Sequence, residues 1–353
     1  MIRTLSTRLL RLLAVLVTVL TVAISLFAWR IASGPLPLDW LTPYIAGALS
    51  AEDGSVEVAV GGTELRRSRD VDLVELVVVD VRATGADGAL LAELPELEIG
   101  LSLRALLRGM IAVARLEATA PHLVLVRRED GSIGLRGTEA GPDGGQIDLR
   151  HLAARLLGPP DQGDPSDYLE RLEILGGRLT LVDQRTGHRL EARDAELSAQ
   201  RHVDGFGSML AFALTQGGAP ADVRLTGRYD RATEWLELVL DVDQLMPANL
   251  ANLLPGLPLG GIDLAITGRL QGAVKLDGER APVRFELAAA PGRVTLPELL
   301  AAPLPIDAAR AEGELASDLA SLVVQRFELT SKEASLSGAG TLSWQGEIGL
   351  DAE

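Results

Sequence analysis

The chain has 353 residues, a formal net charge of −16 and no cysteine. Of its 33 basic residues, four lie in residues 1–30, which contain no acidic residue; the remainder therefore carries 29 basic against 49 acidic residues, a net charge of −20. Such an acidic segment repels polyanions, which argues against nucleic acid as a partner. The lack of cysteine excludes disulfides, thiolate metal sites and cysteine nucleophiles. Aromatic residues make up only 3% of the chain, which favours a thin, extended architecture over a thick core.

The first predicted element is an uncharged apolar run at residues 12–29, preceded by three arginines. A helix of this length measures ~27 Å, close to the ~30 Å of a hydrocarbon core. After Arg30 the next basic residue is Arg66, so the charge asymmetry predicts a cytoplasmic N-terminus. A cleaved signal peptide is the alternative, which the long apolar region and Arg30 disfavour. We therefore expect a single-pass anchor in residues 1–32, with these side chains facing lipid: Leu12, Leu16, Val19, Leu20, Ile24, Leu26, Phe27 and Trp29.

A short amphipathic stretch, Trp40 to Leu49, follows a proline-containing linker. Amphipathic rings are favoured at membrane surfaces, so Trp40 and Tyr44 would lie there. The alternative is a helix that caps the following domain. Both interpretations remain open from the sequence.

From Ser55 onward the dominant pattern is alternation of apolar and polar residues with period two, which is typical of strands with one apolar face. Turn signals such as Gly176-Gly177 and Asp277-Gly278 separate the strands, which favours antiparallel neighbours. The alternating segments lie in residues 56–60, 222–230, 234–243, 262–266 and 283–287.

Helices are expected at only three further places, Leu103–Ala114, Ile147–Leu157 and Met246–Leu254. Residues 138–168 are rich in Gly, Pro and Asp and are interpreted as a flexible or helical linker. This divides the chain after the anchor into an N-terminal β-rich segment, 33–137, and a second β-rich segment, 169–353.

No catalytic motif is found. Asp130-Gly131-Ser132-Ile133-Gly134 places its serine one position too early for a nucleophile elbow, and there is no phosphate loop. The four histidines are scattered, without the spacing of a metal site. Most carboxylates lie on the polar face of an alternating strand. We expect no enzyme activity, no cofactor and no metal, and retain an unrecognised hydrolase as a minor alternative.

Residues 94–135 resemble the N-terminal region of the AsmA-like proteins of Gram-negative envelopes, and of the YhdP type most closely, a group related to TamB. The resemblance rests on a strand after Pro95, then Ser102-x-x-Ala105-Leu106-Leu107-Arg108-Gly109, then Ala120-Pro121-His122-Leu123 and Asp130-Gly131. Residues 241–268 and 291–342 are similar to the repeated strand groups of such proteins.

The resemblance implies a periplasmic chain anchored in the inner membrane, whose curled, taco-like β-sheet carries phospholipid acyl chains between the two membranes without covalent chemistry. Membrane phospholipids, the inner membrane and other envelope proteins would be its partners. Family members thought to bridge the envelope are much longer; roughly fifteen strands at ~4.8 Å spacing give a groove of only ~70 Å. The candidate lining, which could equally be the core of a plain sandwich, is Val223, Leu225, Tyr229, Leu236, Leu238, Leu240, Val242, Ile262, Leu264, Ile266, Val283, Phe285 and Leu287.

A second hypothesis for the function is a periplasmic scaffold that assists outer-membrane protein assembly by pairing its strand edges with partners.

Overall fold

The computed structural model describes most of the chain from Ser33 onward together with a few residues before it. The described residues are 15, 17–19, 21, 22, 25, 26, 29, 30, 33–50, 56–66, 75–85, 88–128, 133–135, 168–184, 187, 189–215, 220–251, 259–275, 277–295, 302–318, 320–332, 334–344 and 348–352. The predicted helix Ile147–Leu157 and nearly all of the predicted linker lie outside them.

The described residues between 15 and 30 are helical, and their apolar side chains are exposed: Val15, Val17, Val19, Val22, Leu26 and Trp29 are each 52–68% accessible. Among the residues described, no helix is long and apolar enough to cross a membrane. The predicted anchor residues Leu12, Leu16, Leu20, Ile24 and Phe27 lie outside the described part. The anchor therefore stays a prediction.

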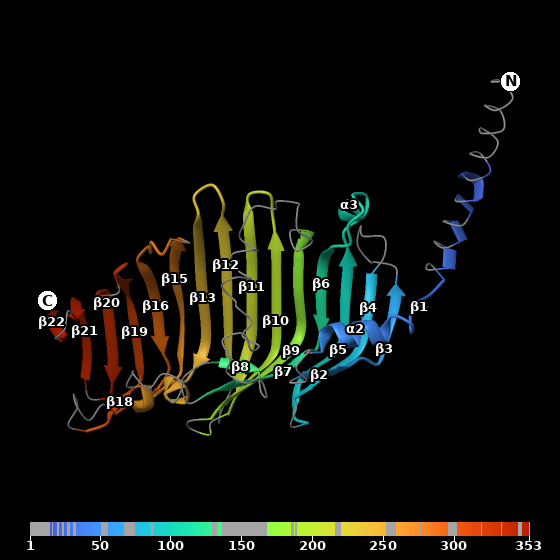
Figure 1. Ribbon diagram of the computed structural model, residues 1–353. Helices are drawn as coiled ribbons and strands as arrows, with labels where there is room; N and C mark the ends of the chain where they lie inside the picture. The colour runs from blue at the N-terminus through green and yellow to red at the C-terminus, as the bar shows by residue number, and fades with distance from the viewer. Residues whose placement is uncertain are drawn as a thin grey trace, which may run out of the picture.

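The fold is mainly β, as predicted, with 66% of the described residues in strands. The strands form one 19-stranded sheet and one three-stranded sheet (Figure 1). The strands of the large sheet are β1 (Leu36–Pro37), β2 (Val56–Ala59), β3 (Gly62–Arg66), β4 (Glu75–Gly85), β5 (Leu90–Leu101), β6 (Val113–Thr119), β7 (His122–Arg127), β8 (Ile133–Leu135), β9 (Arg171–Asp183), β10 (Arg189–Arg201), β11 (Gly205–Thr215), β12 (Ala221–Asp230), β13 (Trp235–Leu245), β15 (Ile266–Lys275), β16 (Val283–Ala289), β19 (Ala308–Leu315), β20 (Ser321–Ser331), β21 (Ala334–Trp344) and β22 (Ile348–Ala352). The small sheet consists of β14 (Ile262–Asp263), β17 (Gly292–Val294) and β18 (Leu304–Ile306).

Neighbouring strands in the large sheet follow the chain order from β9 to β22, apart from the excursions into the small sheet. The prediction of an antiparallel sheet is wrong at one place, because β9 pairs in parallel with both β6 and β7. A parallel pair needs a long crossover, and the chain between β8 and β9 provides the length. The two predicted β-rich segments thus belong to one sheet.

Two positions in the sheet are each occupied by a pair of consecutive short strands. β2 and β3 lie along the same edge of β4, at opposite ends of it, in a single register. β6 and β7 likewise share one register along β5 and along β9. Each pair is therefore one long strand with a local interruption, and the 19 strands of the described part occupy at most seventeen positions side by side, or up to ~80 Å at ~4.8 Å spacing.

The interruptions form a line across the sheet where the strands bend. Asp80 in β4, Ala120 between β6 and β7, and Asp194 in β10 have positive φ values of 53°, 48° and 51°. Gly176 in β9, with φ of 65°, lies opposite Ala120, whose N–H donates to the carbonyl of Leu175 at 2.7 Å. We call this line the crease. The prediction of a turn at Gly176-Gly177 is wrong, because these glycines form a bend inside a strand that continues through the crease.

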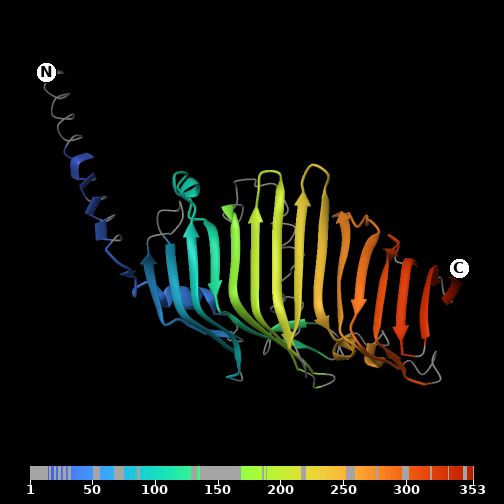
Figure 2. The ribbon, with the colours of Figure 1, turned by 180° about the vertical axis from the view of Figure 1, so that it is seen from behind.

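At the crease the apolar alternation of β4 shifts by one position, although the pairing of β4 with β2, β3 and β5 keeps the same register on both sides of Asp80. In β4, Val78 and Val81 belong to one buried cluster with Val58, although residues three apart would normally face opposite sides of a strand. The positive φ of Asp80 turns the strand between them. A bulge with a shift of register is found in β10, between Arg193 and Glu196. The sheet bends along the crease (Figures 1 and 2), and the cluster of Val58, Val78 and Val81 keeps one face apolar on both sides of it.

The described helices lie at the margins of the sheet. Helix α2 (Thr42–Leu49) packs Ile45 against the cluster around Val58 and Val78, so it caps the N-terminal end. Helix α3 covers only Leu103–Leu106, which corrects the predicted helix Leu103–Ala114. That helix ends early because Gly109, with φ of 76°, reverses the chain and β6 begins at Val113.

Two short 3₁₀ helices, η2 (Pro247–Leu250) and η3 (Leu259–Gly261), lie near the small sheet. The prediction of an α-helix over Met246–Leu254 is corrected to η2, and residues 252–254 lie outside the described part. Fully buried large side chains, such as Val77, Val78 and Leu91, are found in the N-terminal half of the sheet, which is where the core sits.

Candidate functional site

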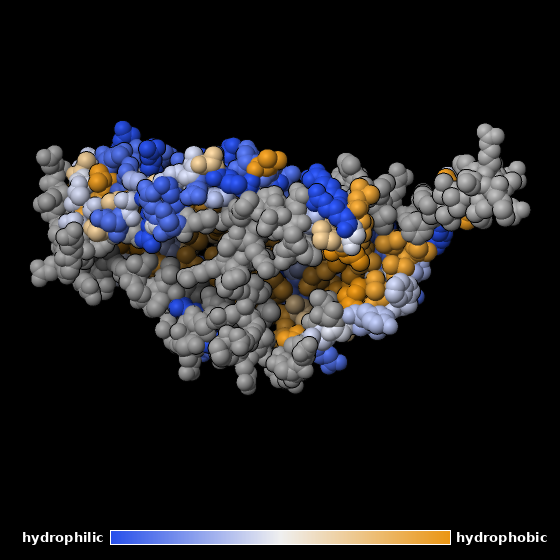
Figure 3. Space-filling view, turned by 45° about the horizontal axis from the view of Figure 1, so that its top comes forward, coloured by the Kyte–Doolittle hydropathy of each residue, from blue (hydrophilic) through white to orange (hydrophobic). Residues whose placement is uncertain are grey.

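The candidate site is the apolar face of the large sheet from β10 to β16, which we call the groove face. The strand register places its side chains in rows that cross five strands. One row is Phe212, Val223, Val242, Gly268 and Leu287, and the next is Leu210, Leu225, Leu240, Leu270 and Phe285. A third is Ser208, Gly227, Leu238, Gly272 and Val283. Figure 3 shows hydrophobic residues gathered in a hollow, with hydrophilic residues along the margin above it.

The predicted lining residues lie on this face with two exceptions. Ile262 is in β14 of the small sheet, where it pairs with Val294, and Leu264 lies in the link between β14 and β15, only 4% exposed. The expectation of one strand over 262–266 is wrong, because the chain changes sheets at Leu264. A Cβ on Gly292 would lie 2.4 Å from the Cβ of Leu264, so this leucine is enclosed beside the small sheet.

Most side chains of the groove face are only half-buried. Val242 and Tyr229 are 8% and 6% exposed, whereas Leu225, Leu238, Leu240 and their neighbours in the rows are intermediate. The described helices lie at the ends of the sheet rather than over these strands. An apolar surface of this extent is unusual in soluble proteins, which makes it the candidate site.

Glycines on the groove face let large side chains lie flat against the strands. Leu238 lies between Gly227 of β12 and Gly272 of β15 in the register. A Cβ on Gly313 of β19 would come within 2.6 Å of the ring of Phe285, so that ring covers the glycine. Large side chains resting over glycines give a smooth apolar floor without deep pockets.

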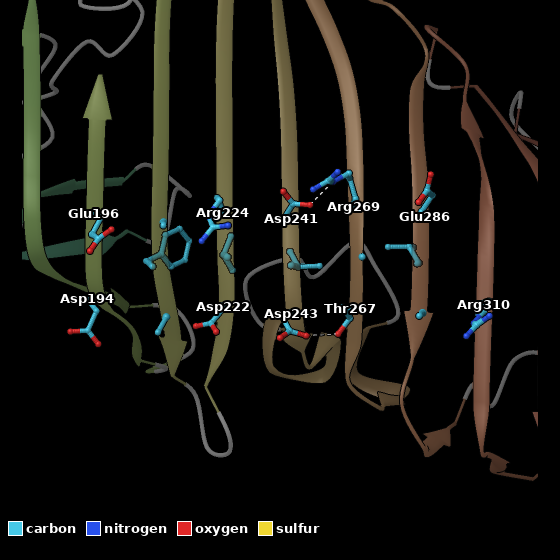
Figure 4. Close-up of a pocket in the computed structure, with 18 of the residues that line it drawn as sticks. Asp194, Glu196, Asp222, Arg224, Asp241, Asp243, Thr267, Arg269, Glu286 and Arg310 are labelled. Atoms are coloured by element: carbon cyan, nitrogen blue, oxygen red, sulfur yellow. Dashed lines mark hydrogen bonds and ion pairs between the residues drawn. The ribbon is translucent and has the colours of Figure 1, made fainter. Parts of the chain in front are cut away.

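The opposite face of the same strands is charged. The guanidinium of Arg269 donates to Asp241 Oδ1 at 2.6 Å, and Thr267 Oγ1 donates to Asp243 Oδ1 at 2.7 Å. The hydrogen bond to Asp241 raises the pKa of Arg269 above its ordinary value. These groups, with others from β10 to β19, line an open hollow of about 960 Å³ (Figure 4), whose lining also includes Phe212, Val223, Val242 and Leu287 from the first groove-face row. Asp222, Arg224 and Asp243 are exposed in it.

Closer to the N-terminus, the same outer face carries a tighter charge cluster. Arg115 lies 3.6 Å from Glu75 and 3.4 Å from Glu173, and also pairs with Glu117. Burial lowers the pKa of Arg115, but the hydrogen bond to Glu117 and the nearby carboxylates outweigh this, so the pKa is raised. The arginine therefore stays protonated and neutralises carboxylates that share its surface.

The part of the chain that the structure describes contains no group of three or more His, Cys, Asp or Glu residues that could hold a metal ion. His122 Nε2 lies 3.3 Å from Thr180 Oγ1, His202 is exposed in a turn, and His151 and His188 lie outside the described residues.

Several groove-face residues were missed by sequence reasoning. Phe206, Leu210 and Phe212 of β11 face the groove, but the other side of that strand carries Met209 and Ala211, so its alternation is hidden. Leu270 could have been found, since Gly and apolar residues alternate with Thr, Arg and Gln along β15.

Comparison with known proteins yields no match: no protein-family model matches the chain, no curated protein is significantly similar, and no solved structure is significantly similar.

Proposed function

We propose that this chain is an AsmA-like envelope protein of the YhdP type, whose groove face carries phospholipid acyl chains across the periplasm. The observation that supports this most directly is the continuous apolar face of β10 to β16, only half-buried and backed by a charged outer face. Acyl chains would lie across the rows of apolar side chains, and headgroups would stay at the wet margin.

The shape of the groove face suits acyl chains better than a folded partner. An acyl chain is flexible and gains ~0.8 kcal/mol per buried CH₂ without needing a directional contact. The glycine-backed floor around Leu238 offers such contacts along its length. Lipid headgroups need polar contacts only at the margins of the groove face. The polar side chains of the strands lie on the opposite face, so they do not interrupt the apolar surface.

The predicted N-terminal anchor would hold this groove at the inner membrane, with the N-terminus in the cytoplasm. The exposed apolar side chains of the helical residues Val15, Val19 and Leu26 support this, since exposed side chains of this kind on a helix are stabilised by lipid. Trp40 and Tyr44, 68% and 71% exposed, remain available for the interface even though α2 caps the sheet.

The scaffold hypothesis has less support at the N-terminal edge of the sheet. There β1 pairs with β3, and Ser50 Oγ accepts the backbone N–H of Val58 at 3.0 Å. Occupied backbone groups of this kind reduce pairing with a partner strand.

Site-specific photo-crosslinking in cells tests the lipid proposal. A benzoylphenylalanine at Leu225, on the groove face, is expected to give a phospholipid adduct that mass spectrometry detects on the full chain. The same probe at the adjacent Thr226, exposed on the outer face, is the matched control and should give none. Absence of lipid at Leu225, or equal adducts at both positions, would refute the proposal.

A further inference from the structure

The loop between β5 and β6 carries an apolar tip at the end of the sheet. Leu106, Leu107 and Ile111 are 45%, 81% and 75% exposed. We call residues 106–111 the α3 tip. Three large apolar side chains on one short loop are an unusual concentration for a solvated surface.

The α3 tip is held in place by buried residues and hydrogen bonds. Ala105, Ala112 and Tyr168 form a buried cluster beneath it, and Arg108 donates to the hydroxyl of Tyr168 at 2.8 Å. The N–H of Met110 donates to the carbonyl of Ala105 at 2.9 Å. Because the base is packed and hydrogen-bonded, the exposure of Leu107 and Ile111 is a built feature of the loop.

Arginines lie in and beside the tip of this acidic protein. Between Glu98 and Glu117 the sequence contains no acidic residue; Arg104 and Arg108 lie at the tip, whereas Arg115 belongs to the carboxylate cluster of the outer face. Arg104, with a side chain 77% exposed, lies 3.4 Å from Glu170, and this exposed pair leaves the guanidinium accessible to other anions. Apolar side chains flanked by arginines match the boundary between anionic headgroups and acyl chains.

The position of the tip agrees with this chemistry. Figures 1 and 2 both place α3 above the strands at the N-terminal end, on the side toward which the described helical residues between 15 and 30 extend. A membrane entered by that helix would therefore meet α3 before it met the turns further along the sheet.

We propose that the α3 tip inserts into the bilayer surface that the N-terminal helix enters, with Leu107 and Ile111 below the headgroups and Arg104 beside their phosphates. Two contacts, the helix and the tip, then fix the orientation of the sheet relative to the membrane. The inference rests on the membrane anchoring in the proposed function, but it does not depend on lipid binding by the groove face.

The test uses the natural absence of cysteine. A single cysteine replacing Leu107, labelled with an environment-sensitive fluorophore, is placed in the full chain reconstituted into phosphatidylethanolamine–phosphatidylglycerol vesicles. We expect a blue-shifted emission that spin-labelled lipid quenches and aqueous iodide does not. The matched control is a cysteine at Val203, 96% exposed in the turn between β10 and β11, which should report water.

A water-like emission at Leu107, or the same shift at Val203, would overturn the proposal. If the Leu107 variant folds poorly, a label on a cysteine at Ile111 provides an independent test. A blue-shifted emission there supports the proposal and a water-like emission overturns it. If the Leu107 label reports water while Leu225 still forms a lipid adduct, only the second membrane contact is refuted. If the Leu107 label reports the bilayer but Leu225 forms no adduct, lipid binding by the groove face is refuted and the membrane contact of the tip stands.

Discussion

Replacement of Leu238 by Asp is expected to remove lipid from the groove face. Leu238 lies in the middle of a row, opposite Gly227 and Gly272, and its Cδ2 would lie 3.5 Å from a Cβ on Gly227. Both direct register partners of Leu238 are glycines, so neither offers a side chain that could hydrogen-bond an introduced carboxylate. The charge would face the bound acyl chain directly.

The magnitude follows from the burial of the leucine. Full burial of a leucine side chain contributes about 1.5–3 kcal/mol, and Leu238 is half-buried in the protein alone, so about 1 kcal/mol remains to be gained against lipid. The carboxylate adds a desolvation cost of at least ~1 kcal/mol. Since ~1.4 kcal/mol is a tenfold change in affinity, lipid occupancy should fall about tenfold or more.

The assay is mass spectrometry of phospholipid retained by the purified full chain, counted per protein. Val239→Asp is the matched control, because Val239 is the next residue of the same strand and faces the outer surface, opposite Thr226 and Gln271. It should retain lipid as the natural chain does. Equal retention in both variants, with circular dichroism showing intact β-structure, would refute the reasoning.

Three further predictions concern stability and ionisation. Ala120→Gly should raise the free energy of unfolding by about 1 kcal/mol, because φ of 48° is costly for alanine; a decrease on chemical denaturation contradicts this. Gly313→Ala should lower it by at least about 1–3 kcal/mol, because the new Cβ would lie 2.2 Å from the backbone carbonyl oxygen of Val323 and 2.6 Å from the ring of Phe285; an unchanged midpoint contradicts this. The hydrogen bond from Arg193 lowers the pKa of Glu191, so this carboxylate stabilises the fold at neutral pH and loses that effect as the pH falls through its folded pKa. NMR titration of the Arg193→Ala chain should show the pKa of Glu191 rise; an unmoved pKa contradicts the assignment.

Matched controls separate these effects from general perturbation. Ala118→Gly lies in β6, beside the crease and without a positive φ, and should destabilise by about 0.5–1 kcal/mol. Gly207→Ala places its Cβ 3.8 Å from His202 Nε2, an ordinary contact, and should leave stability nearly unchanged.

The strands with strict alternation are predicted well from sequence, because burial of one face imposes period two on the residues themselves. β12 and β16 match their predicted segments closely, and α2 lies within the predicted amphipathic stretch. Alternation fails as a guide where both faces are apolar, as in β11. It also fails where a chain leaves the sheet within one alternating segment, as at Leu264.

The parallel pairing of β9 depends on contacts between distant segments. Short turn signals identify hairpins. The partner of a strand that follows a long connection depends instead on which strand edge of the sheet still has unpaired backbone groups. Only the tertiary structure shows that β9 completes the edge presented by β6 and β7.

The sequence by itself determined the mainly β fold, the charge of the outer face and most of the groove-face residues, because each follows from local periodicity and composition. The tertiary structure decided the crease. Asp80, Ala120 and Asp194 are far apart in the chain. In the sequence, each one is only an isolated interruption of the apolar–polar alternation. Pairing between strands aligns these breaks into one line, because β4, β5, β6, β7 and β9 keep one register on both sides of it, which places each break opposite the break or bend of the next strand. That alignment bends the whole sheet around its apolar face.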